Sequence, residues 1–185
     1  MNNHRQVRQP KRLKQRPQYR GMAIPYIALI DAVTGQPDFR VTDEQKRASV
    51  IRNRWCQLCG EQLGKFFFFV GGPEAAKANQ YFEPACHLDC LLYAMQVCPF
   101  IVGRSEHADI EKVAAKHPEL TVKADETFST VRNPLWIIKK ANGWSLMKTE
   151  QGTILLYPWV VKETPALEPD KMSASDWRAV EKYLL

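Results

Sequence analysis

The sequence predicts an α+β protein in which helices and short antiparallel strands surround one compact module that contains cysteine and histidine. Three observations support this class. Strand-like and helix-like segments alternate in the first part of the chain, and two close pairs of cysteine and histidine residues lie among them. Strand-like segments separated by turn signals then follow, before a last helical pattern. The 185 residues are 45% hydrophobic, which is enough to bury a core.

The elements before the first cysteine pair are expected to be a strand and a helix. Residues 24–33 are largely apolar and end at a turn signal that contains Gly35, which predicts a strand. Thr42 and Gln45 fit a capping box, which predicts a helix over residues 43–54 with Thr42 as its N-cap. This helix would lead directly into the first pair.

The first cysteine pair is expected to form a tight turn followed by a hairpin. Two residues separate Cys56 from Cys59, and Gly60 comes next, where a turn around a metal needs a residue free to take positive φ. Residues 65–70 are rich in phenylalanine and favour a strand, which the Gly-Gly-Pro sequence that begins at Gly71 ends. These features predict a knuckle that leads into a β-hairpin.

The second pair is expected at the start of a helix. Apolar residues recur at steps of three and four over residues 86–97, which predicts a helix that begins near residue 86. His87 and Cys90 would then lie at positions i and i+3 on its first turn. The positive end of the helix dipole favours a thiolate at such a position.

Together the two pairs predict one structural Zn²⁺ site with Cys56, Cys59, His87 and Cys90 as its ligands. Each pair can supply two adjacent corners of a tetrahedron, so the four residues close the coordination sphere. A catalytic zinc ion keeps one position open for water or substrate. We therefore expect one zinc ion in a structural role and no catalytic residues.

The identity of one ligand remains open. Cys86 and Cys90, at positions i and i+4, could both face the metal while His87 turns away. Cys98 follows the helix and precedes Pro99, where we expect it to pack rather than to bind. An odd number of cysteines and a polar, basic start of the sequence favour a cytoplasmic protein with reduced thiols over a disulfide scaffold.

The last part of the chain is expected to form a three-stranded antiparallel meander. Its strand-like segments cover residues 134–140, 144–149 and 153–161. The turns between them are expected at Asn142-Gly143 and at Gln151-Gly152, which are both good hairpin signals.

Two helices are expected on either side of this meander. Ser105 can cap a helix over residues 106–116, and Ser173 or Ser175 can cap a C-terminal helix over residues 176–185. The packing stripe of the C-terminal helix would consist of Trp177, Val180, Tyr183 and Leu184.

The net charge of +6 belongs to the start of the chain. Residues 1–20 carry +7 and contain no acidic residue, so residues 21–185 carry about −1 in total. Such a polar segment cannot fold alone, and it can bind the phosphates of RNA or DNA in a salt-dependent way. The candidate nucleic-acid-binding residues are Arg5, Arg8, Lys11, Arg12, Lys14, Arg16 and Arg20.

Three regions are therefore expected along the chain. Residues 1–20 would form a disordered basic arm, and residues 21–118 a zinc-binding α+β core. Residues 119–185 would form the meander and the C-terminal helix, packed on the same core. No apolar run is long enough to span a bilayer, so we expect no membrane association.

Residues 55–98 resemble a treble-clef zinc finger, in which a knuckle and hairpin supply two ligands and the first turn of a helix supplies the other two. This resemblance implies a zinc module and no particular function, because treble clefs occur in nucleases, ribosomal proteins and ubiquitin-system proteins. Most of the chain also resembles a family of small uncharacterised bacterial and phage proteins, which implies zinc binding without an established activity. The motifs that carry it are residues 24–27, residues 54–60, residues 87–90, Cys98-Pro99, the Trp136 strand and the Gly152 turn.

Common enzyme motifs are missing from the sequence. It contains no phosphate loop, dinucleotide fingerprint or nucleophile elbow, and its second pair does not match a zinc deaminase. The leading prediction is a structural-zinc protein that associates with nucleic acid through its basic arm. The alternative is a protein-interaction regulator of phage or bacterial origin that docks on a host protein, and the third is a metal-dependent enzyme of unrecognised type. No small-molecule substrate is indicated.

Overall fold

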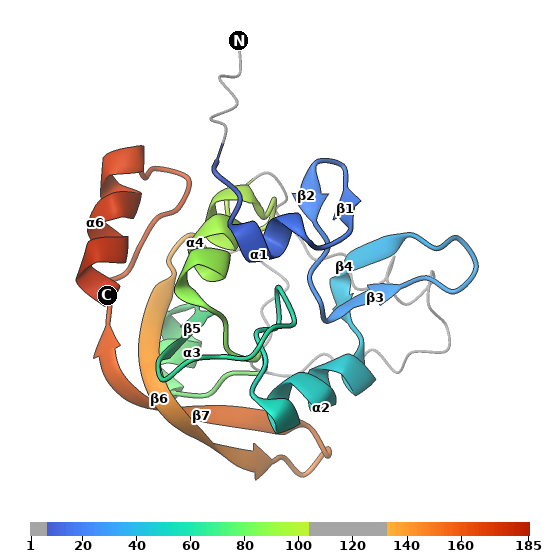
Figure 1. Ribbon diagram of the computed structural model, residues 1–185. Coiled ribbons are helices and arrows are strands. Elements are labelled where there is room, and N and C mark those ends of the chain that lie inside the picture. Colours follow the sequence, from blue (N-terminus) through green and yellow to red (C-terminus); the bar gives the residue numbers. More distant parts are fainter. Residues whose placement is uncertain (1–6, 104–132) are drawn as a thin grey trace.

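The computed structural model describes residues 7–103 and 133–185, and within these ranges the chain forms five helices and three antiparallel sheets (Figure 1). The predicted α+β class is confirmed. Arg5 and the helix predicted over residues 106–116 lie outside the described ranges.

The described N-terminal residues fold onto the rest of the protein. α1 (Lys11–Lys14) precedes a two-stranded sheet of β1 (Gln18–Tyr19) and β2 (Met22–Ala23). Leu13 is 2% exposed and belongs to the hydrophobic core. Residues 7–20 therefore differ from the disordered arm that we predicted, because one apolar side chain anchors a segment whose overall composition is polar.

A second two-stranded sheet replaces the single strand predicted over residues 24–33. β3 (Ala28–Ile30) pairs with β4 (Pro37–Thr42) across a turn in which Gly35 has a φ of +66°. The backbone N–H groups of Tyr26 and Ile27 donate instead to carbonyls of the knuckle, those of Leu58 at 3.0 Å and Gln57 at 3.2 Å. This part of the predicted strand is thus attached to the first cysteine pair.

α2 (Glu44–Asn53) begins one residue later than the predicted capping box requires. Its N-cap is Asp43, whose carboxylate accepts hydrogen bonds from the backbone N–H groups of Gln45 and Lys46, both at 3.0 Å. Thr42 is the last residue of β4 instead. Aspartate is an N-cap at least as favourable as threonine, so the neighbouring residue takes that position.

The largest sheet joins the first cysteine region to the last part of the chain. Its antiparallel strands, in the order β5–β6–β7, are β5 (Phe67–Gly71), β6 (Ile137–Lys148) and β7 (Ile154–Glu163). The hairpin predicted after the knuckle is wrong, because β5 pairs with β6 and meets the nearby chain through one bridge, between Phe68 and Cys86. Its consecutive phenylalanines are all buried, which requires packing on both faces.

The three-stranded meander predicted for residues 134–161 is also wrong, since β6 continues through the first expected turn. Asn142 and Gly143 form an irregularity in the pairing between β6 and β7. A Cβ atom at Gly143 would lie 2.1 Å from Cε3 of Trp159, so the indole ring occupies the space above this glycine. The second turn is confirmed, with Gly152 at a φ of +87°.

Three further helices complete the described structure, namely α3 (Pro73–Ala78), α4 (Leu88–Val97) and α6 (Ala174–Leu184). Figure 1 shows the long β6–β7 hairpin curving around α3 and α4. α6 begins with the predicted cap at Ser173, whose hydroxyl accepts from the N–H of Asp176 while the Asp176 carboxylate accepts from the N–H of Ser173.

The hydrophobic core lies between the largest sheet and α4. Phe67, Ile138 and Leu156 of the sheet and Met95 of α4 are all less than 2% exposed. The C-terminal helix adds part of its predicted stripe, because Trp177 and Leu184 are buried, Val180 is partly buried and Tyr183 is 46% exposed. One core thus supports both cysteine pairs.

Candidate metal centre

The first half of the centre is a tight turn over Cys56, Cys59 and Gly60. The N–H of Gly60 donates to the carbonyl of Cys56 at 2.8 Å, and the N–H of Cys56 donates to the carbonyl of Glu61 at 2.8 Å. Gly60 has a φ of +80°, as predicted. A Cβ atom there would also lie 2.5 Å from Cδ2 of Tyr26, so both backbone conformation and close packing require glycine.

The second half lies at the start of α4. His87 is the N-cap, with φ of −68° and ψ of 151°, and Cys90 is the third helical residue. The predicted helix start near residue 86 is therefore corrected to Leu88. The bridge between Cys86 and Phe68, with N–H to carbonyl distances of 2.8 and 2.9 Å, keeps the chain extended up to the N-cap.

These two halves bring the four predicted ligands together. The ligand atoms of Cys56, Cys59, His87 and Cys90 all lie within 4.8 Å of one another. Nδ1 of His87 is 3.4 Å from Sγ of Cys59. A tetrahedral zinc ion with Zn–S of about 2.3 Å and Zn–N of about 2.0–2.1 Å places sulfur and nitrogen about 3.6 Å apart, so this spacing fits a zinc-sized ion.

Backbone groups orient these side chains. Nε2 of His87 lies 3.0 Å from the carbonyl oxygen of Gln62, so the Nε2–H tautomer donates there and leaves Nδ1 as a ligand toward the thiols. The N–H groups of Glu61 and His87 lie 3.5 Å from Sγ of Cys59 and of Cys56, respectively. Such donors stabilise thiolates.

The protonation of the metal-free cluster fits a cation site. Burial raises the pKa of Cys56, but hydrogen bonds from its cysteine neighbours and His87 lower it well below its usual range. Burial lowers the pKa of His87, but hydrogen bonds to Cys56 and Cys59 and their negative charge raise it to about 10. Hydrogen bonds to Cys56 and Cys59 raise the pKa of Cys90 well above its usual range. Thiolate charge at Cys56 favours a cation at this position, and a divalent cation would allow the protons on His87 and Cys90 to leave.

Cys86, the alternative ligand, lies outside this group of four. It is 1% exposed, and the side-chain amide of Gln57 donates to its sulfur at 3.4 Å. The same amide donates to the carbonyl of Pro84. Cys98 is half-buried at the C-cap of α4, as a packing residue would be.

The basic residues of the N-terminal segment divide into two groups. Arg8, Lys11, Lys14 and Arg20 are exposed. Arg16 is half-buried and donates through Nε to the carbonyl of Ile24 at 3.2 Å. Arg12 is also half-buried and forms ion pairs with Glu61 and Asp89 beside the candidate metal ligands. Two of the predicted nucleic-acid contacts are therefore engaged within the protein.

Several residues around the centre were not predicted from the sequence. Gln62 contacts His87 only through its backbone carbonyl, which every residue has, so its residue type does not indicate this contact. Glu61 lies two residues after Cys59, and Asp89 lies between His87 and Cys90, so their acidic side chains could have indicated a basic partner. Gln57 lies inside the first cysteine pair, where its burial depends on the tertiary fold.

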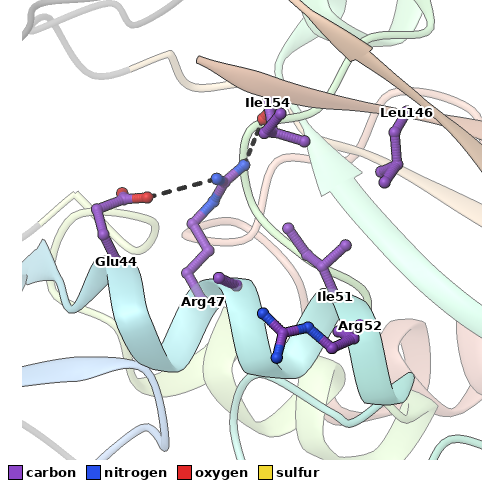
Figure 2. A pocket seen from close by; sticks show the side chains of 7 residues that line it. Glu44, Arg47, Ile51, Arg52, Leu146 and Ile154 are labelled. Carbon is purple, nitrogen blue, oxygen red and sulfur yellow. Dashed lines mark hydrogen bonds and ion pairs between the residues drawn. The ribbon is translucent and has the colours of Figure 1, made fainter. Parts of the chain in front are cut away.

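A cavity of about 360 Å³ lies away from this centre, between α2 and the β6–β7 hairpin (Figure 2). Arg47 is 3% exposed and donates to the carbonyls of Ile154 at 2.6 Å and Phe82 at 2.7 Å, so its guanidinium is used in joining segments. No serine, cysteine or histidine is found among the described residues that line the cavity. These are Glu44, Arg47, Ala48, Ile51, Arg52, Leu146 and Ile154.

In comparisons with known proteins, the chain matches no family model, no curated protein and no solved structure. The resemblances to treble clefs and to small bacterial and phage proteins stay predictions. Within the described residues, none of the helices combines the length and apolar character needed to cross a membrane.

Proposed function

We propose that the protein binds one structural zinc ion through Cys56, Cys59, His87 and Cys90. The observation that carries this proposal is the convergence of three sulfur atoms and one imidazole nitrogen within 4.8 Å. Soft thiolates and imidazole are the donors that zinc prefers, and four of them complete a tetrahedron without a position for substrate.

The zinc ion would reinforce the contact between two segments that hydrogen bonds already join, such as the one from the N–H of Gln57 to the carbonyl of Ala85 at 3.2 Å. The knuckle follows α2 and the helix start follows α3, and the one bridge at Cys86 links β5 to the residues before α4. In a treble-clef arrangement a hairpin connects knuckle and helix, and here β5 and that bridge would take its place. Metal binding therefore contributes directly to folding.

Metal analysis tests this proposal. Protein purified without added metal should contain about one zinc ion per chain, and removal of the ion with a chelator should lower the melting temperature and be reversed by zinc. A protein that is fully folded without metal, and whose melting temperature does not change when zinc is added, would contradict it.

We further propose that the zinc-stabilised core presents a nucleic-acid-binding surface on its N-terminal segment. The supporting observation is that Arg8, Lys11, Lys14 and Arg20 remain exposed on a segment that is otherwise folded. Positive charges on a folded segment bind phosphates without the ordering cost of a flexible arm. No base-reading contact is implied, so the expected binding depends on salt and is indifferent to sequence.

A further inference from the structure

Arg12 connects the two halves of the candidate metal centre from outside. Its Nη1 lies 3.8 Å from a carboxylate oxygen of Glu61, which follows the knuckle. Its Nε lies 3.3 Å from a carboxylate oxygen of Asp89, which stands between His87 and Cys90. The guanidinium thus bridges the same two segments that the metal would join.

The protein fixes the position of Arg12. The neighbouring Leu13 is 2% exposed and lies in the core cluster that includes Cys59 and Cys90. The side-chain amide of Gln18 donates to the Leu13 carbonyl at 3.1 Å. The Arg12 side chain is 32% exposed and the side chains of Glu61 and Asp89 are 49% and 44% exposed, so any effect of these ion pairs depends on Arg12 being held in place rather than on burial of the charges.

The negative charge of a zinc-loaded centre makes the positive charge of Arg12 beside it favourable. Zn²⁺ with three thiolates and a neutral imidazole carries a net charge of about −1, and Glu61 and Asp89 add negative charge beside it. Burial lowers the pKa of Arg12, but the charges of Asp89, Cys90, Cys59 and Glu61 raise it overall, so the guanidinium stays positive here. It offsets the repulsion between the thiolates and the two carboxylates.

We propose that Arg12 is a positioning residue of the metal centre that holds the knuckle and the start of α4 at ligand spacing and slows the loss of zinc. This inference rests on the proposed zinc site and adds a residue of the N-terminal segment to it. Outer-shell partners of metal ligands commonly change metal affinity by about 10–100-fold when they are removed. Lysine lacks the planar fork that lets arginine reach two carboxylates at once, so it should replace Arg12 only in part.

The rate of zinc transfer to an excess of a coloured chelator tests the inference. We expect Arg12→Gln to release zinc about 10-fold or more faster than the wild type, and Arg12→Lys to fall between them. Arg8→Gln is the matched control, because Arg8 is an exposed arginine of the same segment and makes no ion pair with Glu61 or Asp89. Added salt should speed release from the wild type more than from Arg12→Gln.

A second set of variants tests the ion pairs of Arg12 without relying on Arg12→Gln alone. Glu61→Gln with Asp89→Asn removes the same ion pairs from the other side, so this double variant should speed release in the wild type but not in Arg12→Gln, where the two carboxylates only repel the thiolates. Equal release rates for the wild type and Arg12→Gln would overturn the inference, and so would an Arg8→Gln protein as fast as Arg12→Gln. A wild type that binds no zinc would instead overturn the proposed zinc site, and this inference with it.

Discussion

The imidazole of His87 and the thiol of Cys59 face each other across 3.4 Å, from Nδ1 to Sγ, although 28 residues separate them in the sequence. His87 is the N-cap of α4, and Cys59 is the last candidate ligand of the knuckle. Their contact brings the two cysteine-containing pairs to the spacing that a tetrahedral ion requires. This contact should depend on the bound metal and on the packing around the knuckle.

Loss of a knuckle ligand should unfold the centre, whereas loss of a nearby packing cysteine should not. We expect Cys59→Ser to lose zinc and to lower the free energy of unfolding by several kcal/mol, since metal binding is part of folding. Cys98→Ser is the control, because Cys98 lies outside the group of four. Zinc content and thermal unfolding measure both variants, and equal losses in the two would contradict the ligand assignment.

Zinc binding at neutral pH should release protons from identified groups. In the metal-free protein His87 is protonated, because its pKa is raised to about 10, and so is Cys90, whose pKa is raised well above its usual range. Zinc requires a neutral imidazole and thiolates. Calorimetry at pH 7 in buffers of different ionisation enthalpy should therefore show that zinc binding releases protons. Zinc binding without proton release would contradict the protonation of His87 and Cys90 in the metal-free protein.

Substitution of the knuckle glycine should cost more than substitution of a glycine with the same backbone conformation elsewhere. Gly60 and Gly21 have φ values of +80° and +78°, but a Cβ atom at Gly60 meets the Tyr26 ring, while one at Gly21 meets nothing within 4 Å. Both alanine variants carry a strain of about 1–2 kcal/mol. Gly60→Ala should lose about 1–3 kcal/mol more through overpacking and should bind zinc more weakly. Equal unfolding free energies for Gly60→Ala and Gly21→Ala would show that the Tyr26 ring moves away from a Cβ atom at position 60 without destabilising the protein.

The irregularity in β6 should depend on the ring of Trp159. Gly143→Ala places a Cβ atom 2.1 Å from that ring and should destabilise the protein by about 1–3 kcal/mol. Trp159 is 59% exposed, so Trp159→Ala should cost less. In a double-mutant cycle followed by chemical denaturation, Gly143→Ala should cost much less when Trp159 is absent. If the losses of unfolding free energy in Gly143→Ala and Trp159→Ala simply add in the double variant, the Trp159 ring is not the reason why position 143 requires glycine.

Binding of single-stranded nucleic acid should depend on the exposed basic residues and not on the engaged arginines. With four contacts, the logarithm of the binding constant should fall with the logarithm of salt concentration with a slope of about −3. Replacement of Arg8, Lys11, Lys14 and Arg20 by Gln should remove this binding, whereas Arg16→Gln should leave the slope unchanged. Fluorescence anisotropy with a labelled oligonucleotide measures the binding constant and its dependence on salt concentration for each protein. No binding by the wild type at low salt would contradict the proposed surface.

Sequence patterns identified the local features of this protein and missed its long-range ones. The ligand pairs, the positive φ at Gly60, the Gly152 turn and the Ser173 cap all follow from a few neighbouring residues. The partner of β5 does not, because a buried phenylalanine run pairs equally well with any apolar strand. Asn142-Gly143 favours a turn in isolation, yet β6 continues through these residues, and Trp159 packs over Gly143.

The sequence did not predict the ion pairs of Arg12, because these contacts also depend on long-range packing. In the sequence it is one of seven basic residues in a polar segment. Its environment depends on Leu13, a single apolar residue that fixes the segment to the core, and on two carboxylates far along the chain. Composition describes the average of such a segment and does not reveal the one residue that anchors it.

X-ray absorption of the zinc-loaded protein identifies the four atoms that bind the metal. We expect three sulfur ligands at about 2.3 Å and one nitrogen ligand at about 2.0–2.1 Å. Four sulfur ligands would show that Cys86 replaces His87, and a water or carboxylate oxygen in the first shell would contradict the closed structural site.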